Sequence, residues 1–330
     1  MKAMVLAAGL GTRLRPITYE LPKPMVPLLD RPVMAHILGL LERAGVTDVI
    51  ANLHYFPDTI RDYFGDAITY RYEEELLGTA GGVRNCADFF GDETFIVISG
   101  DALSDIDIAA FKKRHDESGG VATLAVKRVD DTSQYGVVLH DDIGRITGFQ
   151  EKPEPADALS ELGNCGIYMF EPRIFDYFPG RPFVDWAHDV FPTLLEQDAP
   201  FYVHEIDDYW NDVGSIDELK QASFDAGAGK LDLALPGTEQ SEGVFVGSGT
   251  DISAADSVNG PVWLGSNVHV GSGARLEGPL VVGDGARIGA GAAVKESVIF
   301  PGSRIQDDEI VISGIVSRRG MLDYLAPYKA

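Results

Sequence analysis

The residues of this sequence best suited to metal chemistry are carboxylates that follow apolar, strand-like runs. Asp101 follows the run Thr94–Ser99 after a single glycine, and Asp212 lies in a second segment of this kind, Tyr209–Leu219. Ligands of parallel α/β sheets bind at the carboxyl ends of the strands, so both carboxylates are expected at that edge. Two carboxylates facing phosphates suit Mg²⁺, which takes few protein oxygens and fills its shell with substrate and water. The pattern favours Mg²⁺ as a cofactor.

A glycine-rich segment, LAAGLGTRLRPIT at residues 6–18, could bind phosphate through backbone N–H groups exposed by a turn after a strand. A tight turn without a ligand would have the same pattern. However, two cations, Arg13 and Lys23, lie close by in the sequence, which favours a polyphosphate ligand. Two familiar nucleotide motifs are absent. A dinucleotide fingerprint needs glycine where Leu14 stands, and a P-loop needs Gly-Lys-Ser/Thr, whereas the Gly-Lys pair here precedes leucine.

Three further motifs carry groups that suit a sugar phosphate or a nucleotide. In FQEKPEP, Glu151 could accept hydrogen bonds from sugar hydroxyls while Lys152 neutralises a monophosphate. In LGNCGIYMFEP, Asn164 lies within reach of hydroxyls, and in YEEELLGTAGGVRN an acidic loop precedes a helix that starts near Gly78. A solvated charge pair would also explain the first motif, and a capped helix beside an exposed loop would explain the last.

Strands that alternate with helices fill residues 1 to about 225, which predicts a doubly wound, mainly parallel α/β sheet. Gly45 is expected as the cap beyond the first helix. The predicted strands are Lys2–Ala8, Asp48–Leu53, Thr94–Ser99, Val121–Val126 and Phe201–Ile206, and the predicted helices are Met34–Ala44, Asp58–Phe64, Thr79–Phe89 and Ser215–Phe224.

The last third of the chain has a period of six residues. Ten apolar residues in succession at this spacing indicate a true repeat, which resembles the hexapeptide repeat of left-handed parallel β-helices. The predicted organisation is a catalytic domain over 1–225, a linker rich in Gly, Ala and acidic residues over 226–242, a β-helix over 243–315 and a C-terminal tail over 316–330. The repeat positions are Val246, Ile252, Val258, Leu264, Val270, Leu276, Val282, Ile288, Val294 and Phe300.

The composition excludes several classes of partner. The chain has 330 residues, with 27 Lys and Arg against 51 Asp and Glu, a net charge of −24. A surface this acidic repels phosphate backbones and anionic lipid, so we expect no nucleic acid and no membrane as partner. Two cysteines are too few for a disulfide framework or a Cys-based zinc site. With no apolar run long enough for a membrane span and no signal peptide at its start, the chain is predicted to be soluble and cytoplasmic.

Eight motifs in one order together resemble the sugar-1-phosphate nucleotidyltransferases, most closely the mannose-1-phosphate guanylyltransferases that end in a hexapeptide β-helix. The motifs are LAAGLGTRLRPIT, PKPMVP, EEELLGTAGG, GDALSDID, YGVV, EKP, NCGIYMFEP and WNDVG, and they cover nearly the whole chain. The resemblance implies a Rossmann-like catalytic domain with a mixed sheet, Mg²⁺, and the reaction NTP + sugar 1-phosphate → NDP-sugar + pyrophosphate.

The resemblance also implies a role for each residue that matches a motif. Arg13, Lys23 and Lys152 would act as catalytic clamps on phosphates, and Asp101 and Asp212 would hold Mg²⁺. Two positions depart from the family pattern, Leu76 where Pro is usual and Cys165 where Ala is frequent. The nucleotide would be held by Leu6, Ala8, Gly9, Gly11, Thr12, Arg13, Lys23, Glu75, Gly78 and Thr79, and the sugar by Gly136, Glu151, Lys152, Asn164 and Gly166.

No protein nucleophile is expected, because positioning and charge neutralisation suffice for in-line attack of a phosphate oxygen on the α-phosphorus. The predicted pair is GTP with mannose 1-phosphate, since the carboxylates of residues 73–75 could accept hydrogen bonds from the donors of guanine. The alternative is a glucose-1-phosphate thymidylyl- or uridylyltransferase. A homo-oligomer formed through the β-helix is also expected, because the open ends of a short solenoid need covering.

Two other classes of protein fit this sequence less well. An acyltransferase built on a hexapeptide helix needs a basic histidine beside the coil, and His269 is the only histidine after residue 204. A non-catalytic regulatory subunit that binds nucleotide sugars would have lost phosphate-binding or metal-binding groups, whereas Arg13, Lys23 and both aspartates are present. Both classes are therefore disfavoured.

Overall fold

The computed structural model describes residues 1–233 and 236–322, which form two compact units. Residues 234–235, inside the predicted linker, and 323–330, most of the predicted tail, lie outside the described residues. No helix of the described part of the chain is both long enough and apolar enough to span a membrane. Unit 1 consists of Met1–Thr12, Ile17–Met25 and Met34–Asp212, and unit 2 consists of Arg13–Pro16, Val26–Val33 and the chain from Val213 onward.

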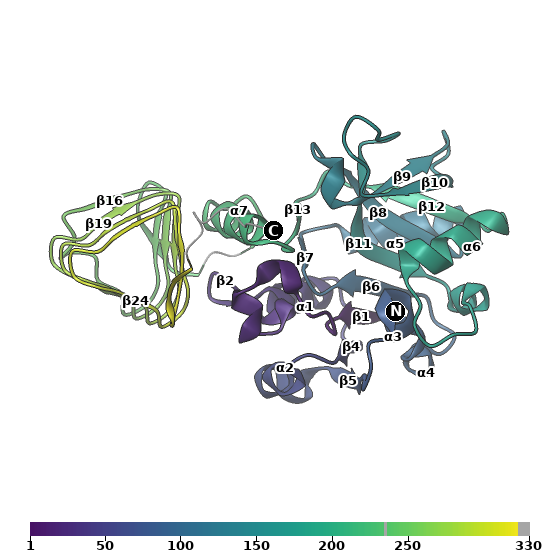
Figure 1. Cartoon of the computed structure of the whole chain (residues 1–330), viewed down its shortest axis with the longest axis horizontal. Coiled ribbons are helices and arrows are strands. Elements are labelled where there is room, and N and C mark those ends of the chain that lie inside the picture. Colours follow the sequence, from purple (N-terminus) through teal and green to yellow (C-terminus); the bar gives the residue numbers. More distant parts are fainter. Residues whose placement is uncertain (234–235, 323–330) are drawn as a thin grey trace. The chain divides into compact units, whose positions relative to one another are not determined.

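A nine-stranded sheet forms the centre of unit 1 (Figure 1). Its strands are β1 (Lys2–Leu6), β4 (Val49–Leu53), β5 (Thr69–Tyr72), β6 (Phe95–Ser99), β8 (Ala122–Arg128), β9 (Gly136–His140), β10 (Ile146–Glu151), β11 (Leu162–Phe170) and β12 (Phe201–Glu205). Seven follow the order β10-β9-β11-β6-β1-β4-β5, while β8 pairs with β11 and β12 pairs with β8. The pairs among β1, β4, β5 and β6 are parallel, but β11 runs antiparallel to β6, β8 and β9. The predicted Rossmann-like mixed α/β fold is therefore confirmed, with more antiparallel pairing than the expected mainly parallel sheet.

The central strands are continuous apolar runs, as expected for strands buried on both faces. The core of β1 (KAMVL), all of β4 (VIANL) and most of β6 (FIVIS) are buried. Leu6 pairs with both Asn52 and Ser99, so the carboxyl ends of β1, β4 and β6 lie side by side. Loops that leave these three strands therefore start from one edge of the sheet.

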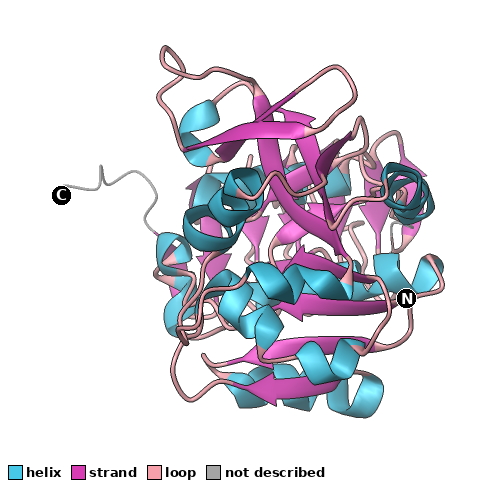
Figure 2. Ribbon diagram, turned by 90° about the vertical axis from the view of Figure 1, so that its right-hand side faces the viewer, coloured by secondary structure: helices cyan, strands magenta, loops and turns pink. Residues whose placement is uncertain are grey.

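Helices connect these strands (Figure 2). The predicted helix Thr79–Phe89 is two helices, because Cys86 donates its N–H to Val83 in an i→i−3 bond that interrupts the α-helical pattern. Gly45 follows the first helix with φ +75°, as predicted for its cap. The helices of unit 1 are α1 (Val33–Arg43, whose first residue belongs to unit 2), α2 (Pro57–Phe64), α3 (Gly78–Arg84), α4 (Ala87–Phe90), α5 (Ile108–Ser118) and α6 (Phe191–Glu196). Short 3₁₀-helices occur at Thr12–Leu14, Ile17–Tyr19, Lys23–Met25, Gly65–Ala67, Thr132–Gln134 and Pro172–Tyr177, and a π-helical turn occurs at Trp186–Val190.

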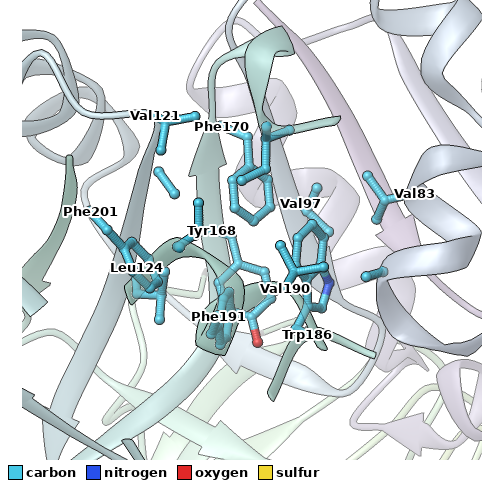
Figure 3. Packing of buried hydrophobic residues seen from close by; sticks show 14 of the residues in the cluster. Val83, Val97, Val121, Leu124, Tyr168, Phe170, Trp186, Val190, Phe191 and Phe201 are labelled. Atoms are coloured by element: carbon cyan, nitrogen blue, oxygen red, sulfur yellow. The ribbon is translucent and has the colours of Figure 1, made fainter. Parts of the chain in front are cut away.

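Aromatic side chains fill the core between β11 and the segment 186–191 (Figure 3). The Trp186 ring stacks on Phe170 with centroids 4.6 Å apart and on Phe191 with centroids 5.7 Å apart. Offset ring stacking of this kind adds about 0.5–1.5 kcal/mol per pair to the free energy gained by burial. The segment 186–191 is therefore held firmly against the sheet.

The C-terminal strands of unit 2 form three parallel stacks, which trace a triangle in Figure 1. We call residues 244–317 the hexad region. One sheet contains β15 (Val244–Val246), β17 (Val262–Leu264), β20 (Leu280–Val282), β23 (Val298–Ile299) and β26 (Ile315–Ser317), flanked by the antiparallel strands β14 (Thr238–Ser241) and β27 (Gly320–Leu322). The second contains β16 (Ser257–Asn259), β19 (Arg275–Glu277), β22 (Ala293–Lys295) and β25 (Ile310–Ile312), and the third contains β18 (His269–Val270), β21 (Arg287–Ile288) and β24 (Arg304–Ile305). This topology is compatible with the predicted β-helix.

The repeat changes register before its last predicted position, Phe300, and continues with a shorter spacing. Val244 pairs with Val262 and Val262 with Leu280, eighteen residues apart, but Val298 pairs with Ile315, only seventeen residues on. The inward column Leu264, Val282 therefore continues at Ile299, and the assignment of Phe300 to it was wrong. The reason is a shorter corner: three residues, 278–280, separate the paired residues Glu277 and Val281, whereas only two, 296–297, separate their partners Lys295 and Val298. Glu296 takes a left-handed φ of 48° there, and Ser313 takes one of 55° at the same corner of the next coil.

The segment predicted to be a linker contains regular structure at both ends. The helix α7 (Ile216–Gly227) is capped by Ser215, whose hydroxyl accepts the Glu218 N–H, and it runs two residues into the segment. At the other end, β14 pairs with β15. Each unit also contains one small antiparallel pair of strands. In unit 2, β2 (Pro27–Leu28) pairs with β3 (Arg31–Pro32). In unit 1, β7 (Ala102–Ser104) pairs with β13 (Trp210–Asp212).

Candidate active site

The loop after β1 is packed closely against the segment that carries Lys23. Gly11 has φ +62°, and a Cβ at this position would lie 2.9 Å from both Lys23 Cβ and Thr18 Cγ2. Thr18 Oγ1 donates a 2.7 Å hydrogen bond to the Gly11 carbonyl. Only glycine combines this left-handed conformation with so close an approach. Gly11 thereby fixes the end of the loop beside Lys23.

The remaining residues of this loop differ in exposure. Ala8 is buried, whereas Gly9 and Thr12 are exposed, and a Cβ on Gly9 would meet nothing within 4 Å. Open space therefore lies beside the backbone at Gly9, where a ligand could approach. Arg13 is also exposed, but it belongs to unit 2, whereas every other predicted site residue belongs to unit 1.

A second close approach brings Asp101 to the end of β1. The Gly100 N–H donates to the Leu6 carbonyl at 2.9 Å, and a Cβ on Gly100 would lie only 2.5 Å from that oxygen. Asp212 reaches the same place from β13, because its backbone pairs with Ala102 of β7. Both predicted metal ligands are therefore positioned by backbone geometry.

Lys23, Asp101 and Asp212 meet to form what we call the carboxylate–lysine cluster. Lys23 Nζ is ion-paired with Asp101 Oδ2 and lies 3.8 Å from Asp212 Oδ1. The three side chains are only 15, 16 and 22 % exposed, so their charges are weakly screened. In the described ranges 1–233 and 236–322, no three His, Cys, Asp or Glu side chains are grouped to hold a metal ion.

Two adjoining cavities lie in unit 1, and they bring together predicted residues of both the nucleotide and the sugar site. Four residues line both: Glu151, Asn164, Ala187 and Phe191. Cavity 1, of about 310 Å³, is also lined by Gly136, Phe149, Gln150, Pro192 and Leu195. Cavity 2, of about 190 Å³, is also lined by Leu6, Thr79, Ser99, Tyr168, Asp185, Trp186 and His188.

The β9–β10 hairpin supplies one wall of cavity 1. Gly136 pairs with Glu151, and a Cβ on Gly136 would lie 3.2 Å from Glu151 Oε2, so glycine leaves the carboxylate its space. Lys152 follows with a left-handed φ of 46°, its side chain 49 % exposed and its Nζ 3.9 Å from Glu151. A left-handed lysine is unfavourable, and such conformations concentrate at functional sites.

An irregularity in β11 presents Asn164 to both cavities. The pairing of β11 with β8 shifts between Asn164 and Tyr168, as in a β-bulge. Asn164 Oδ1 accepts the Gly166 N–H at 3.0 Å, and Asn164 Nδ2 donates to the Tyr168 hydroxyl at 3.1 Å. Gly166 has φ +69°, and a Cβ there would lie 2.8 Å from Ser99 Oγ, so glycine is required. Burial raises the pKa of Tyr168, which keeps its hydroxyl protonated.

Two predicted nucleotide-binding residues contact protein partners. A Cβ on Gly78 would lie 2.4 Å from the Val184 carbonyl oxygen, so this glycine allows α3 to begin against the segment after residue 183. Thr79 Oγ1 donates to Asp185 Oδ2 at 2.8 Å and accepts the Trp186 N–H at 3.1 Å. Both of these bonds tie Thr79 to the wall of cavity 2.

The acidic loop differs from its prediction at one residue. Glu74 and Glu75 are exposed, but Glu73 is buried. The Glu73 carboxylate accepts hydrogen bonds from Asn52 Nδ2 at 2.8 Å and from the Leu77 N–H at 3.2 Å. The expectation that all three carboxylates are offered to a base was therefore wrong for Glu73, because its oxygens already have protein donors.

Sequence reasoning missed the segment 185–191, which contributes five residues to cavity 2. Asp185 caps it by accepting the N–H groups of Ala187 and His188, and the π-helical turn that follows is a structure found frequently at functional sites. The sequence FVDWAHDVF does contain a pattern that could have predicted this turn, because Asp185 is a suitable N-cap before the aromatic residue Trp186. Asn52 was missed as well, because it stands within an apolar strand.

Comparison with known proteins identifies the family of this chain. Residues 2–228 match the family model described as "Nucleotidyl transferase". The chain is 38 % identical to a UTP–glucose-1-phosphate uridylyltransferase of Synechocystis sp., over 98 % of this chain and 89 % of that protein. It is 36 % identical to a mannose-1-phosphate guanylyltransferase of Mycobacterium tuberculosis, over 68 % of this chain and 64 % of that protein. A solved UDP-glucose pyrophosphorylase in complex with UDP-glucose shares the fold, with a TM-score of 0.60 and 22 % identity over 67 % of this chain and 96 % of that one. The chain therefore belongs to the sugar-1-phosphate nucleotidyltransferase family.

Proposed function

We propose that this protein transfers a nucleotidyl group from a nucleoside triphosphate to a sugar 1-phosphate, with release of pyrophosphate. The observation that carries the proposal is the carboxylate–lysine cluster at the carboxyl ends of the central strands. Ser99 lines cavity 2, and Asp101 follows it by two residues, so charged groups that suit phosphates lie next to a hollow lined by polar and aromatic side chains. Phosphoryl transfer needs this combination of charge neutralisation and positioning rather than a protein nucleophile.

In the proposed mechanism, a phosphate oxygen of the sugar 1-phosphate attacks the α-phosphorus of the NTP in line. The bond from the α-phosphorus to the bridging oxygen of the β-phosphate breaks, and pyrophosphate leaves with that oxygen. The backbone of Gly9, Gly11 and Thr12 would hold the triphosphate, with Arg13 and Lys23 neutralising its charge. Lys152 would bind the sugar phosphate, so that the two anions are held in contact.

The sugar would occupy the cavities beside Gly136, Glu151, Asn164 and Gly166. A carboxylate, an amide and the backbone of two glycines can together donate and accept hydrogen bonds from several hydroxyls. The aromatic rings around them would pack against the apolar face of a pyranose. Leu6 and Ala8 would lie under the nucleotide, with Gly78 and Thr79 near its base.

The donor set of the carboxylate–lysine cluster fits Mg²⁺, which we propose as the cofactor. Asp101 and Asp212 offer hard oxygen ligands, and Mg²⁺ typically takes one or two carboxylates and completes its shell with phosphate oxygens and water. When bound, the ion would add positive charge to the triphosphate. Lys23 is paired with both carboxylates and would then turn its ammonium group to the phosphates.

The nucleotide and sugar are the finer part of the proposal, and two pairs each have one supporting observation. UTP with glucose 1-phosphate is supported by the Synechocystis relative, whose similarity includes the C-terminal part of the chain. GTP with mannose 1-phosphate is supported by the exposed carboxylate of Glu75, which could accept the two adjacent donors of guanine. With Glu73 turned inward, we place UTP and glucose 1-phosphate first and the guanylyl pair second. The predicted cytoplasmic location remains a prediction.

For the C-terminal part, we propose a left-handed parallel β-helix over about residues 243–315, after a catalytic domain and a short linker, and a homo-oligomer formed through it. The outward side chains of β25 support this, because Ile310 and Ile312 are 66 % and 53 % exposed on the last strand of their sheet. Replacing both by Asp should yield monomers in light scattering at micromolar concentration. Arg275→Ser, an outward change on β19 within the same sheet, is the matched control and should leave the assembly intact. A wild-type chain that is already monomeric would contradict this part of the proposal.

Pyrophosphate release measured over five NTPs and four sugar 1-phosphates tests the proposed reaction. We expect turnover with at least one pair that needs both substrates, and formation of the matching NDP-sugar. If folded protein with Mg²⁺ present releases pyrophosphate from none of these pairs, the enzymatic proposal is wrong. A non-catalytic regulatory subunit would then be favoured. If GTP with mannose 1-phosphate is used at least tenfold better than UTP with glucose 1-phosphate, the order of the two pairs is reversed.

A further inference from the structure

A buried polar pair joins the two loops that would hold the nucleotide, and its members are Asn52 and Glu73. Asn52 is 3 % exposed and Glu73 is 2 % exposed, and Asn52 stands in β4, a buried strand that is otherwise apolar. Buried polar groups are retained when their hydrogen bonds are complete, because an unpaired group in the interior is costly. The bonds of this pair lead to two different loops.

On one side, Asn52 holds the start of the loop after β1. Asn52 Oδ1 accepts the Ala7 N–H at 2.9 Å, and Asn52 Nδ2 donates to Glu73 Oε1 at 2.8 Å. These partners fix the orientation of the amide, because the Ala7 N–H needs an acceptor and the carboxylate needs a donor. The last residue of β1, Leu6, therefore leads into a loop whose first N–H is fixed by a side chain of β4.

On the other side, Glu73 holds the loop that precedes α3. Its Oε2 accepts the Leu77 N–H at 3.2 Å, its backbone N–H donates to the Leu53 carbonyl at 2.8 Å, and its carbonyl lies 2.9 Å from His54 Nδ1. The hydrogen bond from the Leu77 N–H to the Glu73 carboxylate thereby closes residues 74–77 into a short loop. Glu75, the residue predicted to meet the base, stands in this loop.

A glycine makes room for the pair. A Cβ on Gly82 would lie 2.6 Å from Asn52 Nδ2 and 2.7 Å from Glu73 Oε1, closer than real Cβ contacts. Gly82 lies inside α3 without a positive φ, so its backbone conformation alone would accept alanine, which favours helices by up to about 1 kcal/mol. The absence of a side chain here serves the polar pair, not the helix.

We propose that Asn52 and Glu73 are positioning residues that couple the loop after β1 to the loop before α3, and so set how tightly the NTP is held. This inference rests on the proposed function, because it takes both loops as the nucleotide site. The coupling follows from the chemistry of the amide: Asn52 is bonded to both Ala7 and Glu73, so a change in the hydrogen bonding of Glu73 can reach Ala7 by rotating Asn52. Neither residue needs to contact the substrate.

Reversing the polarity of the pair tests this coupling. In Glu73→Gln, the new amide can still accept the Leu77 N–H but presents its own NH₂ group to Asn52 Nδ2, so Asn52 must turn over and lose the Ala7 bond. In Asn52→Asp, two buried carboxylates face each other. In the double variant N52D/E73Q, the glutamine donates to Asp while both backbone N–H groups keep an acceptor. All three hydrogen bonds are then made again, with the carboxylate moved from residue 73 to residue 52.

We expect Glu73→Gln to raise the KM for the NTP about tenfold or more, with a smaller change in the KM for sugar 1-phosphate and in kcat. Amide hydrogen exchange at Ala7, which Glu73 does not touch, should accelerate by a similar factor. The double variant should restore both values to within about threefold of wild type. Gly82→Ala, which changes no polar group, should reproduce the effects of Glu73→Gln. Glu171→Gln is the control, since Glu171 accepts from Thr94 and contacts His115 at the opposite end of the strands.

Three outcomes would overturn the inference. The first is unchanged Ala7 exchange in Glu73→Gln, and the second is a double variant no better than the worse single variant. The third is a loss in Glu73→Gln confined to one base among the NTPs, which would make Glu73 a direct base ligand. Amide exchange does not depend on turnover, so a failure of the proposed function would be seen separately, as a wild-type chain that releases no pyrophosphate. If Glu73→Gln does not fold, the double variant and Gly82→Ala still decide the matter.

Discussion

The carboxylate–lysine cluster and the two cavities adjoin the same strand ends but differ in the side chains that form them. The cluster consists of three charged side chains from separate segments, which neutralise one another in part. The cavities are lined by rings such as Phe149 and Phe191, stacked with centroids 5.0 Å apart, and by polar groups already hydrogen-bonded to protein. Charged groups that can exchange one partner for another suit the reaction step, in which phosphate charge shifts. A rigid cavity lining suits binding of the substrate. Substitutions in the two regions should therefore have different kinetic signatures.

The largest effect is expected in the cluster. Asp101→Asn and Asp212→Asn each remove a hard anionic ligand and leave Lys23 with less compensation, so kcat should fall by at least about 10²-fold, or about 2.7 kcal/mol of barrier. Steady-state kinetics with Mg²⁺ titration would measure this loss. Asp88→Asn is the control, because Asp88 is an exposed aspartate paired with Arg71. A folded variant that keeps a near-normal rate would remove that aspartate from the site.

The next largest effect is expected from the clamps. Lys152→Ala should raise the KM for sugar 1-phosphate and lower kcat, because its charge would act in both the ground state and the transition state. Arg13→Ala should chiefly impair use of the NTP. Measuring KM for each substrate separates the two roles. If Lys152→Ala impaired only the NTP, the two assignments would have to be exchanged.

A smaller effect, on binding alone, is expected in the cavity wall. Tyr168→Phe removes the oxygen that Asn164 Nδ2 donates to, so the amide would lose one of the bonds that hold it in place. A positioning loss of about one hydrogen bond, about 1 kcal/mol, corresponds to roughly a fivefold rise in KM for the sugar phosphate. We expect kcat to stay within about twofold. An equal fall in kcat would place Tyr168 with the cluster instead of the wall, and the comparison between the two regions would fail.

The two regions were also unequally predictable from the sequence. Asp101 and Lys23 could be predicted because an apolar run followed by Gly-Asp, and a glycine loop followed by cations, are local patterns. The wall from Asp185 to Phe191 could not, because its role depends on contacts with Thr79, more than a hundred residues earlier. Asn52 was hidden for the same reason, since its partners Ala7 and Glu73 are distant in sequence.

For the fold, periodic segments were predicted best. The strands β1, β4 and β6 and the stacked coils of the hexad region follow from runs and repeats that need no tertiary information. The break at Cys86 and the shift after Val294 were missed, because each depends on a single residue that changes the backbone path. Phe300 shows the limit well: it is apolar and at the expected spacing, yet a one-residue shorter corner makes Ile299 the inward residue.

Glu75→Ala tests the nucleotide site, where we expect a modest change in the preference between GTP and UTP. Glu75 is exposed, so its removal should change the preference between GTP and UTP by about tenfold at most, if this carboxylate meets guanine. Competition between the two nucleotides in one reaction would measure the ratio directly. An unchanged ratio would leave selection of the base to backbone groups.

The smallest effect is expected from the cysteines. Burial raises the pKa of Cys86 to about 12 and holds that of Cys165 well above its ordinary value, so both are neutral thiols at physiological pH. In the native protein, a thiol reagent should therefore modify neither cysteine faster than the protein unfolds. Cys165→Ala should leave kcat and both KM values within about twofold. Rapid modification of Cys165 that stopped turnover would show that the wall near Asn164 opens in solution.

The shortened corner of the hexad region restricts how this part of the molecule can change during evolution. Each coil rests only on its neighbours, so a whole coil can be duplicated or lost while the inward column is kept. An insertion of one residue within a strand would instead turn the side chains after it to the opposite face, until a corner of different length restores the column. The corner at Glu296 and Ser313 is one residue shorter than the corner before it, and both residues have a left-handed backbone conformation. Length variation among descendants should therefore occur in steps of seventeen or eighteen residues, with single-residue gaps collected at this one corner.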